Sequence, residues 1–323
     1  MKQFCSFIFV LAFSALNAQD TFSIVAVDSV TGEVGSAGAS CLQAPNPPIG
    51  CLIISDVMPG IGAIHTQAQW NADNQSYAHQ MLADEHRAPQ AIIDELVQSD
   101  ADNDPTIRQY GIAAFDSAGH PVTAGYTGAS CFDYKNHVLG SYYSVQGNIL
   151  LGQQILDSME ARFLHTPGSL ADRLMAALQG ANVAGADTRC MSEGIPAQSA
   201  FVRVARPTDS DTALYLHLVV KSRPYGMSPV DSLQTLFNQW KQTHTGIPEV
   251  TEEEIKVSPN PASNNCTIQF TGGKERSVEV YDLMGKKMFE QTCFVRSQFS
   301  VADWAKGIYF IRTGNTVRKL LVQ

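Results

Sequence analysis

The chain has 323 residues, of which 44% are hydrophobic, and its formal net charge is −9. This length suits one large domain and a smaller one, and the hydrophobic content is ordinary for a soluble protein. Residues 256–323 contain ten Lys or Arg and five Asp or Glu, a net +5 that leaves −14 for the remainder. Such an asymmetry indicates separate modules. The acidic larger part argues against nucleic acid or an anionic membrane as a partner.

The N-terminus has the pattern of an export signal, which we assign to residues 1–18. Lys2 is a short basic region, 4–16 is an apolar run, and Ala18 completes a small-residue cleavage site. Cleavage there leaves Gln19 and Asp20 in front of Thr21. The apolar run is too short to span a bilayer comfortably, and no other stretch is long enough, so we expect an exported protein without a transmembrane span.

Export places the cysteines in an oxidising compartment, where an even number favours disulfides. Cys5 leaves with the signal, and six cysteines remain. Six cysteines allow 15 pairings, and domain membership alone guides our choice. We expect Cys41 with Cys51, Cys131 with Cys190, and Cys266 with Cys293. The chain has no C-x-x-C and no H-x-x-x-H pair, so we predict no metal site and no cofactor.

The larger part begins with a buried strand at 21–28, which a Gly-containing turn joins to a second strand at 33–40. Further strands are predicted at 51–57, 61–66, 109–115, 122–126, 199–204 and 213–220. Helices are predicted at 74–84, 88–98, from just after Asn148 to 165, at 170–179 and at 229–244. Helices that cluster between groups of strands indicate an α+β layered domain rather than alternating βαβ units.

Three further stretches complete the chain. The acidic segment 100–105 resembles the start of a calcium loop. Pro105 stands where that loop needs glycine and Gly111 where it needs glutamate, so we predict a solvated connector. Residues 245–255 form a polar, acidic linker. Residues 256–323 alternate short apolar and polar runs between turn signals, which is typical of a small β-sandwich.

The larger part resembles the domain of unknown function 1028 family, which is grouped with the N-terminal nucleophile (Ntn) hydrolases. The resemblance covers 21 to about 243 and rests on ordered blocks, among them Thr21-Phe22-Ser23-Ile24-Val25-Ala26, Thr66-Gln67-Ala68, Arg108-Gln109, Tyr143-Ser144-Val145-Gln146-Gly147-Asn148, Asp187 with Arg189, and Gln198-Ser199-Ala200. It implies a four-layer αββα fold with two sheets face to face and helices outside.

The tail resembles the C-terminal sorting domain of type IX secretion in Bacteroidota. The residues that carry this likeness are Ser258-Pro259-Asn260-Pro261-Ala262, Val280-Tyr281-Asp282-Leu283-Met284-Gly285-Lys286 and Gly307-Ile308-Tyr309-Phe310-Ile311-Arg312. The likeness implies recognition by the type IX secretion machinery and delivery to the cell surface or the medium.

The Ntn resemblance implies that Thr21 is a nucleophile whose own free α-amine is the base. That chemistry requires removal of Gln19 and Asp20, because an acylated amine cannot accept a proton. It also needs a nearby cation to lower the pKa of the amine. The chain has no lysine between Lys2 and Lys135, so Arg108 or Arg189 would supply the charge. The alternative is that Thr21 merely begins a buried strand.

Other residues are candidates for the same site. Gln146 and Asn148 could donate to an oxyanion, although Asn148 could instead cap the following helix. Asp187 and Arg189 could form an ion pair or bind a carboxylate. Polar residues at strand ends could line a cleft, or could serve only as turn and cap residues. They are Asp28, Ser40, Thr66, Gln67 and Asn71, and the family resemblance adds Gln198 as a further candidate.

Two functions therefore remain open. The first is an exported amidohydrolase or peptidase with Thr21 as nucleophile, acting on a small-molecule or peptide substrate. The second is a non-catalytic surface protein that uses the same cleft to bind a small polar ligand or a peptide.

Overall fold

The computed structural model describes residues 18–19, 21–223, 225–244, 256–270, 276–294, 296–313 and 316–323. Most of the predicted export signal and the predicted linker at 245–255 lie outside these residues. The chain divides into two compact units, unit 1 at residues 1–238 and unit 2 at residues 239–323. Each unit is described by itself below.

Unit 1 is built on two antiparallel sheets. The six-stranded sheet has the order β11-β10-β3-β2-β9-β8. In chain order these strands are β2 (Thr21–Asp28), β3 (Glu33–Ser40), β8 (Asn136–Leu139), β9 (Tyr143–Gly147), β10 (Ser199–Ala205) and β11 (Leu216–Val220). The hairpin of β2 and β3 forms its centre, with Thr21 opposite Ser40. All but the last residue of β2 are buried, as expected for a strand apolar on both faces.

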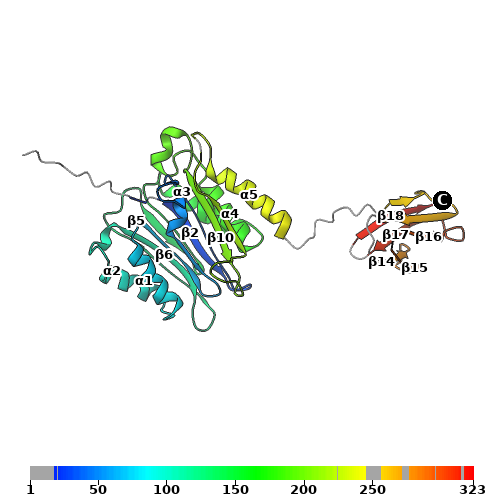
Figure 1. Ribbon diagram of the computed structural model, residues 1–323, viewed down its shortest axis with the longest axis horizontal. Helices are drawn as coiled ribbons and strands as arrows, with labels where there is room; N and C mark the ends of the chain where they lie inside the picture. Colours follow the sequence, from blue (N-terminus) through cyan, green and yellow to red (C-terminus); the bar gives the residue numbers. More distant parts are fainter. Residues whose placement is uncertain are drawn as a thin grey trace, which may run out of the picture. The chain divides into compact units, whose positions relative to one another are not determined.

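The second sheet of unit 1 is five-stranded and contains the path β1-β5-β6-β7, with β4 also paired to β5. Its strands are β1 (Ala18–Gln19), β4 (Ser55–Met58), β5 (Gly62–Gln69), β6 (Arg108–Phe115) and β7 (Pro121–Thr127). Strand β2 packs against β5 and β6, so the two sheets lie face to face (Figure 1).

Helices cover the outer faces of both sheets. Helices α1 (Ala72–Ala83) and α2 (Pro89–Gln98) pack on the five-stranded sheet. Helices α3 (Gln153–His165) and α4 (Leu170–Gly180) pack on the six-stranded sheet, and α5 (Pro229–His244) is hydrogen-bonded beside α4. Unit 1 is thus a four-layer αββα sandwich, as the family resemblance implied (Figure 1).

Local signals fixed the ends of several helices. Pro89 occupies the first turn of α2, and Ser169 with Asp172 forms the predicted capping box of α4. Two predictions need correction. Gly50–Ile54 is a 3-10 helix rather than the start of a strand. Helix α3 begins at Gln153 after Gly152, so Asn148 does not cap it.

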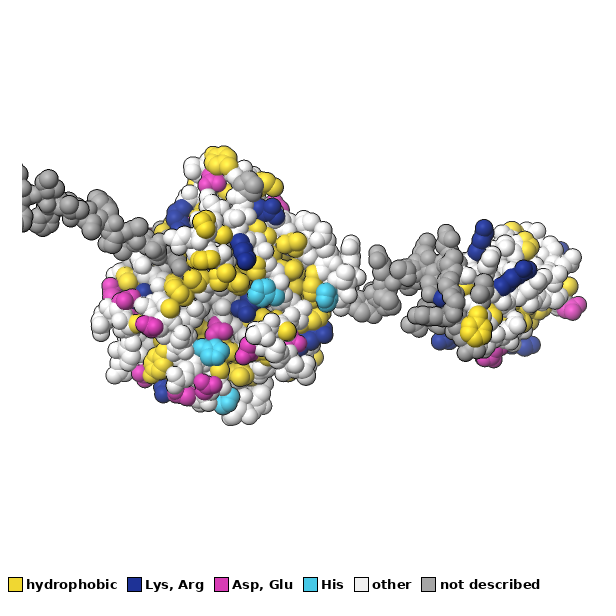
Figure 2. All heavy atoms as spheres, viewed as in Figure 1, with side chains coloured by type: hydrophobic (Ala, Val, Ile, Leu, Met, Phe, Trp, Pro, Cys, Tyr) yellow, Lys and Arg dark blue, Asp and Glu magenta, His cyan; other side chains and the backbone are white. Residues whose placement is uncertain are grey.

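Unit 2 is the predicted β-sandwich. A three-stranded sheet has the order β12-β13-β16, and a four-stranded sheet has the order β15-β14-β17-β18. The strands are β12 (Lys256–Ser258), β13 (Asn265–Gln269), β14 (Arg276–Tyr281), β15 (Lys287–Cys293), β16 (Arg296–Ser300), β17 (Gly307–Thr313) and β18 (Thr316–Val322). Both sheets contribute to one apolar core, which includes Ile268 from β13 and Val280 from β14. Figure 2 shows Lys and Arg side chains on the visible face of this unit.

The predicted cysteine pairing is wrong. The one disulfide among the described residues joins Cys41 to Cys190, with their Cα atoms 5.9 Å apart. Cys51, Cys131, Cys266 and Cys293 are buried and are not disulfide-bonded. Domain membership could not decide the pairing, because Cys41 and Cys190 both lie in unit 1. Cys41 follows β3 directly, while Cys190 comes from a 3-10 helix (Thr188–Glu193) that folds back to that strand end.

Candidate active site

Thr21 lies at the first position of β2 and is fully buried. Its backbone N donates to Asn148 Oδ1 at 3.4 Å. Its carbonyl oxygen accepts from the Asn148 backbone N and from Gln67 Nε2, each at 3.2 Å. Two of the predicted residues, Asn148 and Gln67, therefore hold the backbone of Thr21 through its N and its carbonyl oxygen.

Asn148 occupies the loop that follows β9, and the backbone around it is unusual. Ile149 has φ of 52°, a left-handed conformation that β-branched residues rarely adopt. Ala68, on the neighbouring strand β5, also lies in this region with φ of 67°. Such strain persists only where the surrounding structure over-determines it, and it gathers at functional sites. Here both residues adjoin side chains that contact Thr21.

Asp187 and Arg189 reach the same strand end from the loop after α4. Asp187 is fully buried, and its carboxylate accepts from the Cys41 backbone N at 2.9 Å and from Arg189 Nη2 at 2.6 Å. Arg189 Nη2 also donates to Ser40 Oγ at 3.3 Å. Ser40 is the β3 partner of Thr21, and directly paired residues of antiparallel strands lie about 5 Å apart. The Cys41–Cys190 disulfide fixes this loop beside the strand.

A small cavity of about 40 Å³ adjoins Asn148. Its described lining is mainly apolar and consists of Ala68, Gln69, Ile107, Ser130, Cys131, Phe132 and Asn148. A cavity that holds benzene measures about 150 Å³, so this one has room only for a small group.

A buried polar layer runs between the two sheets from the Thr21 end inward. Its members have no exposed area and are Ser23, Ser36, His65, Gln67, Gln109, Ser144 and Gln146. Ser23 Oγ donates to Gln67 Oε1 at 2.6 Å and accepts from Gln146 Nε2 at 2.7 Å. Gln67 Nε2 donates to Gln109 Oε1 at 2.8 Å. The side-chain amide of Gln146, which we expected beside the oxyanion, thus contacts Ser23 and His65 instead.

His65 is the titratable member of this layer. Burial lowers the pKa of its imidazole to about 3, and the Arg203 charge adds to the effect. The neutral ring fits its neighbours, since Nε2 lies 3.0 Å from Ser36 Oγ and Nδ1 lies 3.2 Å from Gln146 Nε2, a donor. The sequence reasoning missed this residue, because one histidine in an apolar strand carries no distinctive signal.

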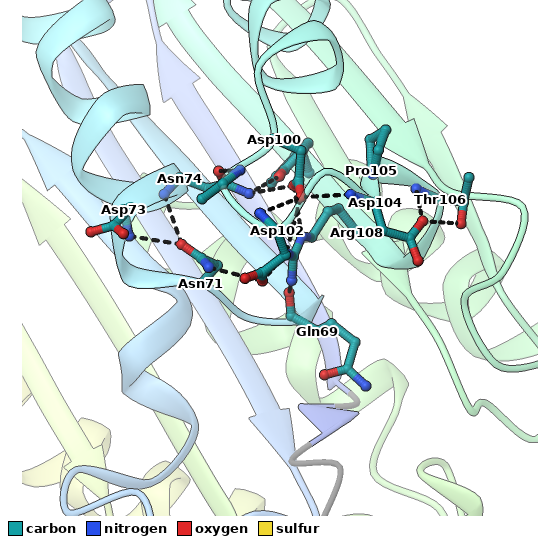
Figure 3. A network of polar contacts seen from close by, with 12 residues as sticks. Gln69, Asn71, Asp73, Asn74, Asp100, Asp102, Asp104, Pro105, Thr106 and Arg108 are labelled. Atoms are coloured by element: carbon teal, nitrogen blue, oxygen red, sulfur yellow. Dashed lines mark hydrogen bonds and ion pairs between the residues drawn. The ribbon is translucent and has the colours of Figure 1, made fainter. Parts of the chain in front are cut away.

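Arg108 belongs to a separate network at the end of the five-stranded sheet (Figure 3). Its side chain is 2% exposed and donates to both oxygens of Asp100, at 2.8 and 3.1 Å, to Asp102 at 2.5 Å and to the Gln69 carbonyl at 2.5 Å. Burial alone would raise the pKa of Asp100, but hydrogen bonds from Arg108 and Asn74 outweigh it and lower that pKa to about 2. Asp100 is therefore a buried anchor rather than part of a solvated connector.

Three other predicted residues serve turns, caps and loops. Asp28 ends β2, roughly 23 Å from Thr21 along the strand, and accepts from Val30 N in the turn. Asn71 caps α1 by accepting from the backbone N atoms of Asp73 and Asn74, and it also donates to Asp102. Gln198 donates its side-chain amide to Glu193 at 2.6 Å. These contacts account for the three side chains without a ligand.

Two negative findings apply to the described part of the chain. Within it, no three His, Cys, Asp or Glu side chains gather in a group that could hold a metal ion. Nor is any helix in that part long and apolar enough to cross a membrane.

Thr66, another of the predicted residues, is buried in β5, and its Oγ1 makes no hydrogen bond.

Comparison with known proteins agrees with this architecture. The crystal structure of a DUF1028-family protein from Silicibacter pomeroyi is similar to this chain at 22% identity, with a TM-score of 0.54. The match covers 69% of this chain and 89% of that one, and at this identity it speaks to the fold alone. A comparison with curated proteins finds no match.

Two families match the sequence itself. Residues 256–323 match the secretion system C-terminal sorting domain, which indicates export through type IX secretion to the cell surface or the extracellular space. The sorting domain also implies contact with that secretion machinery. Residues 21–231 match the family of unknown function DUF1028. The chain therefore belongs to the DUF1028 family and is a secreted member that carries a type IX sorting tail.

Proposed function

We propose that the exported protein hydrolyses an amide bond, with Thr21 as an N-terminal nucleophile of the Ntn type. The observation that carries this proposal is the contact between Thr21 N and Asn148 Oδ1 at the head of β2. The Ntn chemistry needs an amine at this position, next to the hydroxyl of the same residue. An acceptor already faces that nitrogen. Ser40 lies opposite Thr21 on β3, and Arg189 donates to Ser40 from the 3-10 helix.

In the proposed reaction, Thr21 Oγ attacks the carbonyl carbon of the substrate while the α-amine accepts the hydroxyl proton. The C–N bond then breaks, the leaving amine takes this proton, and the acyl group remains on Thr21 Oγ as an ester. Water attacks the ester and gives one proton to the same α-amine. The ester bond breaks, Oγ regains the proton, and a carboxylic acid is released.

The surrounding residues suggest how this chemistry is supported. Asn148 directs Oδ1 at the amine. We assign its side-chain Nδ2 as the donor to a developing oxyanion. Arg189 favours the neutral amine through its positive charge. Between the two arginines that the sequence offered, Arg189 is the better candidate, because it donates to Ser40, the β3 partner of Thr21, whereas Arg108 is held by Asp100 and Asp102 in the other sheet.

The second candidate function is binding without catalysis. It is favoured by the complete burial of Thr21 in a chain that still carries residues 18–20. If the exported protein keeps Gln19 and Asp20 after cleavage of the signal, the amine remains acylated and the site can only bind a small polar ligand or a peptide.

A reactive probe separates the two functions. The chain is expressed with a removable Met directly before Thr21 and is exposed to a β-lactone, which acylates a nucleophilic hydroxyl. We expect one adduct, located on Thr21 by peptide mass spectrometry, and none in Thr21→Ala or in a chain that begins at Gln19. Thr31→Ala, in an exposed turn, is the matched control and keeps the adduct. An unmodified Thr21 in a folded chain would overturn the hydrolase proposal.

A further inference from the structure

The segment just before Thr21 belongs to a different sheet from Thr21 itself. Strand β1 pairs antiparallel with the end of β5, with Ala18 opposite Gln69 and Gln19 opposite Ala68. The next described residue, Thr21, starts β2 in the six-stranded sheet. The chain thus leaves an edge of the five-stranded sheet and enters the nucleophile position within one residue.

Strand β1 fills a gap on β5. One edge of β5 is covered by β6 as far as Ala68. On the other edge, β4 pairs only with Gly62–His65, and β1 covers Ala68 and Gln69 beyond it. Removal of residues 18–20 would leave this short stretch of β5 without a strand on that side. An open edge presents backbone groups that pair readily with an extended peptide.

We propose that this vacated edge, at Ala68 and Gln69, binds the acyl side of a peptide substrate as an added antiparallel strand. The link to chemistry rests on the proposed function. Residues before Thr21 form the acyl group on its nitrogen, and a substrate leaves its acyl group on Oγ of the same residue. The two acyl groups start from neighbouring atoms, so β1 marks the path that a peptide substrate takes.

The small cavity lies on this path and selects the side chain of the bound peptide. Ala68 and Gln69 contribute to its wall, and Asn148 joins the wall to Thr21. Ile107 and Cys131 make the lining apolar. Side chains alternate along a strand, so only one of two successive residues of the peptide points into the cavity. The cavity measures about 40 Å³ with β1 in place, and its apolar lining favours an apolar side chain of the peptide there.

The edge is held in shape before any peptide arrives. Arg108 donates to the Gln69 carbonyl, and Arg108 is itself fixed by Asp100 (Figure 3). Ala68, the residue before Gln69, has the left-handed conformation described above. A rigid edge spares the peptide part of the ordering cost of binding.

The test uses residues 21–323 with Thr21→Ala, which binds without turnover. The probe is the tripeptide acetyl-Ala-Gln-Asp-amide, which copies residues 18–20. We expect saturable binding and at least about tenfold slower hydrogen exchange at the one of the Ala68 and Gln69 amides that faces the open edge, because successive N–H groups of a strand point to opposite edges. The same peptide with N-methylated amides should bind at least about tenfold more weakly, because it cannot donate to the strand. A chain that begins at Ala18 should gain no further protection, since β1 already occupies the edge.

A pair of variants tests the cavity. Ser130→Phe fills the cavity from its exposed rim and should weaken binding of the tripeptide at least about tenfold. Ala129→Phe, at the adjacent and also exposed position, should leave that binding unchanged. Equal binding of the N-methylated peptide, or binding without protection at either Ala68 or Gln69, would overturn the inference. The two proposals fail separately. Lactone labelling without strand binding removes only this inference. Strand binding without labelling removes the hydrolase and leaves the edge as a peptide-binding site without turnover.

Discussion

At the scale of single residues, the polar layer between the sheets sets the response to acid. The pKa of His65 falls from an unfolded value near 6.5 to about 3, chiefly through burial. Between about pH 3 and pH 6.5, His65 is therefore protonated in the unfolded chain but neutral in the folded chain. The stability that neutral His65 provides is complete above about pH 6.5 and is lost as the pH falls toward 3.

We predict that unfolding free energy, measured by urea denaturation, falls between pH 7 and pH 5 by about 2 kcal/mol through His65 alone. His65→Gln should lose this part of the pH dependence, whatever its stability at pH 7. His165→Gln, at an exposed helix end, should retain it. Identical pH profiles for wild type and His65→Gln would show that the imidazole is protonated in the fold.

The sequence predicted the positions of some of these residues and gave no signal for others. The family blocks predicted Thr21, Asn148, Asp187 and Arg189, and the structure brings them to one end of the β2–β3 hairpin. The contacts within the polar layer depend on which strands face each other across the sheets. A local pattern cannot give that information, so Gln146 was expected next to Thr21 and lies against Ser23 and His65.

At the scale of elements, local signals located most strands and helices, and tertiary pairing decided the rest. Hairpin and cap residues predicted β2, β3, α2 and α4 closely. The strands β8 and β9 were missed, because β9 is short and polar and is stabilised by pairing with β2. The disulfide was mispaired for a similar reason, since Cys41 and Cys190 are 149 residues apart.

The network around Arg108 supports β5 and β6 at the site end (Figure 3). Arg108→Met leaves the Asp100 charge buried without its main partner and should lower the unfolding free energy by about 3–5 kcal/mol. Addition of Asp100→Asn removes that charge and should recover part of the loss. Arg87→Met, in a half-exposed ion pair, should cost less than about 1 kcal/mol. Equal small effects of Arg87→Met and Arg108→Met would contradict the anchoring role.

At the scale of the whole molecule, each unit has its own core, and the charge difference in the sequence corresponds to this division. Residues 256–323 form a separate β-sandwich that carries the net positive charge and the sorting domain. A C-terminal domain that serves as a sorting signal does not need to contribute to the stability of unit 1. Composition and charge alone indicated two modules in the sequence.

Truncation tests that independence. A chain that ends at His244 should unfold with the same midpoint as unit 1 in the full chain, within about 2 °C, when followed by calorimetry. The full chain should show a second transition from unit 2. A large loss of stability on truncation would show that the two units depend on each other.

The central claim is that the exported protein presents Thr21 as its N-terminus. Intact mass and terminal sequencing of the protein recovered from its native host test it most directly. The account predicts a chain that begins at Thr21, with a free amine beside Asn148. A chain that begins at Gln19 would keep the amine acylated and would contradict the nucleophile. One that begins at Ala18 would also keep β1 in place and would contradict the vacated strand edge as well.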